Sequence, residues 1–129
     1  MLSDLTGEAI DAVVETVVGS SLLTFELRHI GGALAVAAPE NGALASLQGR
    51  FLYFGAGIAP APEGKAAVER PVELVQAALA PWDAGLTFLN FMERPTEPQR
   101  FFPPDVHRRL REIKGRVDPD DLLQANHPV

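Results

Sequence analysis

The chain has 129 residues, 47% of them hydrophobic and 22% charged, which is typical of one globular domain, so we predict a single domain over residues 1–129. The net charge of -6 disfavours binding to nucleic acid, and the absence of cysteine excludes disulfides, thiolate metal sites and a cysteine nucleophile. No apolar run reaches the ~18 residues of a membrane span, and no basic leader opens the chain, so we expect a cytoplasmic protein without membrane contact.

The N-terminal segment has the apolar spacing of an amphipathic helix. We predict this helix from about residue 4 to residue 18, with Ser3 or Thr6 capping its N-terminus and Gly19 ending it in a left-handed conformation. The apolar stripe that the spacing places on one face consists of Ile10, Val13, Val14, Val17 and Val18.

Four segments carry strand signals. Residues 22–28 alternate apolar and polar side chains, and residues 50–58 are rich in aromatics with two glycines where another group approaches closely. Residues 33–38 follow a bend at Gly31 and Gly32, and residues 86–91 form a short apolar run. With the helices, these segments predict an α+β fold: a mostly antiparallel sheet of about four strands with helices packed on one face.

The segments between and after these strands predict two further helices and a turn. Pro39, Asn41 and Gly42 predict the turn. One helix ends at residue 80, and because of Pro71 it either begins near Arg70 or is kinked there. The last helix begins near residue 104 and is followed by a short turn capped by Asp118, with Asp121 at the spacing of a capping box. The stripe that this helix buries consists of Val106, Leu110, Ile113 and Val117.

Few residues suggest chemistry on their own. The chain lacks the standard phosphate-loop, hydrolase and metalloprotease motifs. The histidines at positions 29, 107 and 127 lack ligand spacing, so we predict no metal site and expect surface or hydrogen-bonded histidines. Glu26 and Arg28 share a strand face, with Arg50 expected opposite them. These residues either line a polar pocket or, as we favour, belong to the solvated face of a sheet. The basic cluster at residues 108–116 forms an anion patch or, the favoured reading, a solvated helix face.

The second half of the chain resembles a known family. Pro81 and Trp82, the FLNF of residues 88–91 and the ending RLREIKGRVDPDDLLQANHPV resemble, in order and spacing, the C-terminal segment of berberine-bridge-enzyme-like FAD-linked oxidases. The upstream ELRHIGGALA of residues 26–35 looks like a strand of the same family's substrate-binding domain. The likeness covers most of the chain and is strongest after residue 80.

The resemblance implies that this chain supplies the substrate-binding part, while a vanillyl-alcohol-oxidase-type domain that holds FAD is absent. By the same likeness Asn90 and Asn126 match positions near the flavin, and Glu26, Arg28 and Phe88 line the substrate pocket. The family's YxNY element reads FLNF here, so both phenol oxygens are missing, and phenylalanine can neither accept nor relay a proton. Glu26 is then the remaining, weak candidate for a catalytic base.

Two functional hypotheses follow from the resemblance. In the first, the chain is the C-terminal piece of an FAD-dependent oxidoreductase that moves a hydride from a substrate carbon to flavin N5, inactive alone or part of a split enzyme. In the second, it is a stand-alone, non-catalytic binding or assembly module. A small flavin-independent acid-base enzyme has no constellation to support it. Because a sheet cut from a larger one exposes strand edges, we expect a homodimer or a flavin-binding partner chain, with a small-molecule substrate.

Overall fold

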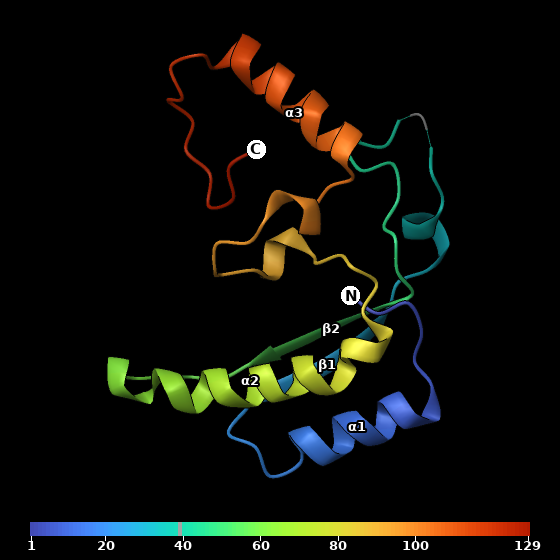
Figure 1. Ribbon diagram of the computed structural model, residues 1–129, viewed down its shortest axis with the longest axis vertical. Helices are drawn as coiled ribbons and strands as arrows, with labels where there is room; N and C mark the ends of the chain where they lie inside the picture. The colour runs from blue at the N-terminus through green and yellow to red at the C-terminus, as the bar shows by residue number, and fades with distance from the viewer. Residues whose placement is uncertain (39) are drawn as a thin grey trace. The chain divides into compact units, whose positions relative to one another are not determined.

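The computed structural model describes residues 1–38 and 40–129, and the elements of these residues form an α+β architecture (Figure 1). It contains the helices α1 (Gly7–Val17), α2 (Lys65–Leu79) and α3 (Pro104–Val117) and the strands β1 (Thr24–His29) and β2 (Phe51–Ala56). Met1–Gly31 and Gly49–Ala84 form unit 1, whereas Gly32–Gln48 and Gly85–Val129 form unit 2. The expectation of one domain over the whole chain stays a prediction.

Helix α1 is capped as the sequence predicts, and it buries one side of the predicted apolar stripe. The hydroxyl of Thr6 accepts a hydrogen bond from the backbone N–H of Ala9 at 3.2 Å, and Gly19 adopts a φ of 77°. Ala9 and Val13 are buried, while three members of the predicted stripe stay exposed: Ile10, Val14 and Val18. Val13 belongs to the predicted stripe, and Val17 of the same stripe packs partly buried against the core. The buried face is therefore one side of the predicted stripe, extended to Ala9.

Strands β1 and β2 pair antiparallel, with Leu27 opposite Tyr53 and His29 opposite Phe51. These two strands confirm two of the four that the sequence predicts. Gly57 permits a close approach, because a Cβ there would lie 2.8 Å from a methyl carbon of Val68. At the start of β2, Leu2 forms an isolated bridge with Phe51.

The prediction of about four strands is wrong for the described residues, whose sheet has two. Residues 33–38 contain instead the 3-10 helix η1 (Gly32–Ala35), entered through Gly32 with a φ of 58°. Residues 86–91 contain the 3-10 helix η4 (Leu89–Phe91). Neither segment has a neighbouring strand, so local turns take up backbone groups that a ladder would otherwise bond. The predicted turn at residues 39–42 includes Pro39, which lies outside the described residues.

Helix α2 continues through Pro71 without beginning there. A proline at position 71 has no N–H to donate to the carbonyl of Ala67 four residues earlier. The hydroxyl of Ser21, which follows α1 in the chain, donates to that carbonyl instead. A side chain far away in sequence therefore satisfies the group that the proline leaves unbonded.

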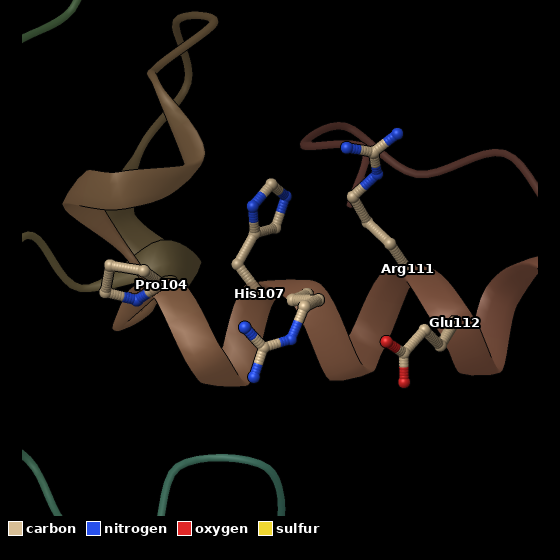
Figure 2. A pocket seen from close by; sticks show the side chains of 5 residues that line it. Pro104, His107, Arg111 and Glu112 are labelled. Carbon is tan, nitrogen blue, oxygen red and sulfur yellow. The ribbon is translucent and has the colours of Figure 1, made fainter.

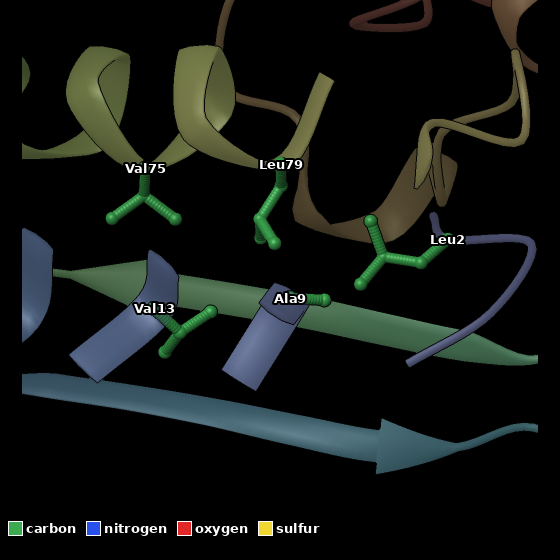
Figure 3. Close-up of a cluster of buried hydrophobic side chains, with 5 residues drawn as sticks. All are labelled: Leu2, Ala9, Val13, Val75 and Leu79. Atoms are coloured by element: carbon green, nitrogen blue, oxygen red, sulfur yellow. The ribbon is translucent and has the colours of Figure 1, made fainter. Parts of the chain in front are cut away.

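The core of unit 1 lies between the two helices and the sheet (Figure 3). Its buried centre consists of Leu2, Ala9, Val13, Val75 and Leu79. Phe25 and Leu27 of β1, together with Phe51 and Tyr53 of β2, pack against this cluster from one face of the sheet. Helices α1 and α2 thus cover the same sheet face.

Unit 2 contains α3 and has a much smaller apolar interior. Among its described residues Phe101 is the one buried hydrophobic side chain, at 4% exposure, and α3 contributes no buried residue. Val106, Leu110 and Ile113 of the predicted stripe are half-buried, while Val117 is exposed. None of the helices in the described part of the chain has the length and apolar character that a bilayer crossing requires.

Candidate functional site

Glu26 and Arg28 lie on the sheet face opposite the helices, as the period of two predicts. Their cross-strand neighbours are Phe54 and Leu52, and the Arg28 guanidinium forms a 2.7 Å ion pair with the Glu26 carboxylate. The side chain of Arg28 is 56% exposed and that of Glu26 is 37% exposed. Arg50, expected to join them, pairs with Asp4 at 2.7 Å. Glu26 and Arg28 therefore form an ion pair on this face, and the Glu26 carboxylate is held by a cation rather than poised alone.

Asn90 lies in the 3-10 helix η4 of unit 2, and Phe88 directly precedes this helix. The N–H of Phe91 donates to the carbonyl of Phe88 at 3.1 Å, and the two rings lie with their centroids 5.3 Å apart. Asn90 lies between these two phenylalanines in the sequence and is exposed. Neither phenyl ring of this turn can transfer a proton.

The C-terminal segment that carries Asn126 is anchored beside this turn. His127 Nε2 lies 2.7 Å from the carbonyl oxygen of Met92, so Nε2 carries the proton and donates it. The ring of His127 also packs on Phe101, the buried aromatic of unit 2, with centroids 4.8 Å apart. Asn126 precedes this histidine directly and is exposed. The structure thus brings together the two segments that hold the asparagines singled out by the resemblance.

The role of His127 had no local signal in the sequence, because its partner is a main-chain carbonyl 35 residues away. The general expectation of a hydrogen-bonded histidine is confirmed at this position. The other ring nitrogen of His127, Nδ1, is buried and has no hydrogen-bond partner.

A shallow hollow of about 380 Å³ lies along the first turns of α3 (Figure 2). It is lined by Pro104, His107, Arg108, Arg111 and Glu112. His107 and Arg111 are four residues apart and project to the same side of the helix. The two arginines belong to the basic cluster of residues 108–116, for which the sequence predicts a solvated helix face or an anion patch, and Glu112 reduces their combined charge.

The C-terminus of α3 is fixed by an ion network around Asp118, which is 7% exposed. Its carboxylate accepts hydrogen bonds from the N–H groups of Leu122 at 2.9 Å and Leu123 at 3.0 Å and from Lys114 Nζ. Asp118 therefore caps the following turn, as predicted. Asp121 does not complete a capping box and instead pairs with Lys114 at 2.8 Å.

These contacts shift all three pKa values in the direction that favours the charged forms. The hydrogen bond from Lys114 lowers the pKa of Asp118, and the N–H of Leu123 adds to the effect. The hydrogen bond from Lys114 also lowers the pKa of Asp121, and hydrogen bonds to Asp118 and Asp121 raise the pKa of Lys114. The network holds the chain as it leaves α3 towards the anchored His127.

The described part of the chain contains no group of three or more His, Asp or Glu side chains placed to hold a metal ion. Comparison of the chain with protein-family models, with curated proteins and with solved structures finds no match. The family resemblance therefore rests on the residues quoted for it and stays a prediction.

Proposed function

We propose that this chain is the substrate-domain part of an FAD-dependent oxidoreductase and acts together with a flavin-binding polypeptide that these residues do not supply. The observation that carries the proposal is the hydrogen bond between His127 and the carbonyl of Met92 at 2.7 Å. It holds the segment of Asn126 beside the turn of Asn90, and both amides are exposed to a ligand.

The residues around these asparagines suit the polar rim and flat face of a flavin ring. A carboxamide offers one acceptor and two donor hydrogens, which matches the alternating ring nitrogens and carbonyls of an isoalloxazine. Phe88 and Phe91 offer apolar rings next to Asn90. FAD, when bound, would supply the hydride acceptor of the reaction class. The chain itself would orient the ring edge with its amides and exclude water with its phenyl groups.

The surface of unit 2 supports the presence of further polypeptide. Beyond Phe101, the described hydrophobic residues of this unit are partly or fully exposed, and Val117, Leu122 and Leu123 are 65%, 78% and 72% exposed. Apolar side chains clustered near one helix end favour coverage by another protein surface. Proton abstraction from substrate, in this proposal, falls to a group of the flavin-binding partner, because Glu26 belongs to unit 1 and is paired with Arg28.

Recovery of flavin with the chain tests this function. A tagged chain is purified from its native host, and FAD released by acid is measured by fluorescence per mole of chain. We expect FAD to co-purify, and we expect Asn90→Ala combined with Asn126→Ala to lower the recovered FAD about tenfold, as loss of roughly 1.4 kcal/mol of hydrogen bonding implies.

The matched control is Gln99→Ala, which removes another exposed amide of unit 2 and leaves FAD recovery unchanged. Absence of FAD from the wild-type preparation would contradict the proposal and favour the non-catalytic module. Full recovery with the doubly substituted chain would contradict the role of the asparagines.

A further inference from the structure

Strand β1 has one edge without a partner strand. Among the described residues it pairs with β2 alone, in a sheet of two strands. The N–H of Ile30 donates to the carbonyl of Arg50 at 2.7 Å, directly beyond the pair of His29 and Phe51. In an antiparallel ladder this places the N–H and C=O groups of the even-numbered residues of β1 towards β2. Those of Phe25, Leu27 and His29 point away from β2, along the open edge.

The charges on β1 are complementary to those of a second β1 running antiparallel. An antiparallel pair of identical strands has a two-fold axis that places one residue opposite its own copy. Glu26 or Arg28 on this axis would place like charges opposite each other, which is unfavourable. With Leu27 on the axis, Glu26 lies opposite Arg28 of the second copy, and Arg28 lies opposite Glu26 of the second copy. Phe25 then lies opposite His29.

The hydrogen-bond pattern makes this register favourable for the charged pairs. Leu27 with its copy forms a hydrogen-bonded pair, so the flanking charged positions form non-hydrogen-bonded pairs, in which opposed side chains lie closest. Within one chain both charged side chains already lie on one face, with a guanidinium nitrogen of Arg28 2.7 Å from a carboxylate oxygen of Glu26. On the helix-covered face, the half-buried Leu27 would meet its own copy.

Charged residues on an edge strand usually prevent such pairing. Here the two charges have opposite signs and lie two residues apart, so they favour pairing: Glu26 of each copy attracts Arg28 of the other. We propose that the open edge of β1 pairs with the same edge of a second copy, centred on Leu27, to form a two-fold homodimer with a continuous four-stranded sheet. This inference goes beyond the proposed function, and its test involves no flavin.

A charge exchange between copies tests the pairing. We expect the wild-type chain to be a dimer by light scattering and sedimentation. Glu26→Arg places arginines opposite each other, Arg28→Glu places glutamates opposite each other, and each is expected to raise the dimer dissociation constant at least about tenfold.

An equimolar mixture of the two singly substituted chains is expected to form a heterodimer, because the arginines of one chain then face the glutamates of the other. Neither chain in the mixture keeps the ion pair within the chain, so recovery reports contacts between copies alone. A monomeric wild type, singly substituted chains that still dimerise, or a mixture that stays monomeric would each overturn the proposal. Circular dichroism identifies any chain that does not fold.

A cross-link gives a second measurement that does not depend on charge. The chain has no cysteine, so Leu27→Cys can form a disulfide only between copies. Paired residues on the axis have Cα atoms about 5.5 Å apart, within the range of a disulfide. The control, Thr24→Cys, places the two sulfurs roughly 20 Å apart along the strands. We expect rapid oxidation to a covalent dimer for the first variant only; equal rates would overturn the register.

Discussion

Truncation of Leu79 is expected to destabilise unit 1 strongly, because this residue lies at the centre of its core. Leu79 is 1% exposed and belongs to the cluster formed by residues of both helices and by Leu2. At about 0.8 kcal/mol per buried carbon, Leu79→Ala loses roughly 2–2.5 kcal/mol of transfer free energy. The cavity left behind adds to this loss, and we expect about 3 kcal/mol in total.

The same helix offers a matched control for this substitution. Leu74 on α2 is 42% exposed, so Leu74→Ala makes the same chemical change with much of the side chain already in water, and we expect a loss below about 1.5 kcal/mol. Urea unfolding followed by circular dichroism measures both. With a slope of about 1–3 kcal/mol per molar urea, Leu79→Ala should lower the midpoint by roughly 1–3 M. Equal midpoints for the two variants would refute the assignment of the core.

Two further predictions concern contacts that the chain makes at its helices. Ser21→Ala should lower the free energy of unfolding by about 0.5–1 kcal/mol in the wild-type background. In a Pro71→Ala background the same substitution should have almost no effect, because residue 71 then supplies an N–H to the carbonyl of Ala67. Equal losses in the two backgrounds of this double-mutant cycle would count against the compensation. The lowered pKa of Asp118 contributes stability that is present above the ordinary carboxyl pKa of about 3.9 and is lost as pH falls through the lower native value. The raised pKa of Lys114 contributes stability that is present below its ordinary pKa and is lost as pH rises through the raised value. Relative to the intrinsic exchange rate at each pH, the protection of the Leu122 and Leu123 amides should therefore fall in acid, and Asp118→Asn should show low protection already at neutral pH; protection factors that do not change with pH would contradict the network.

Local sequence patterns predict only some of the contacts in the candidate site. The period of two along β1 correctly predicts that Glu26 and Arg28 share a face, because alternation is a property of the extended backbone itself. The pairing of Arg50 with Asp4 and the anchoring of His127 on Met92 join residues far apart in sequence. No local pattern encodes such contacts, since each depends on where distant segments come to lie.

Elements whose signals are local are correctly predicted from the sequence. The Thr6 cap, the Gly19 ending, the strands β1 and β2 and the helix of residues 104–117 follow from side-chain periodicity and backbone preference within a few residues. Packing between distant segments settles which part of the apolar stripe of α1 is buried, how α2 continues through Pro71, and why residues 33–38 and 86–91 form turns. A short apolar run becomes a strand only when a neighbour accepts its hydrogen bonds, and within the described residues β1 and β2 alone provide that for each other.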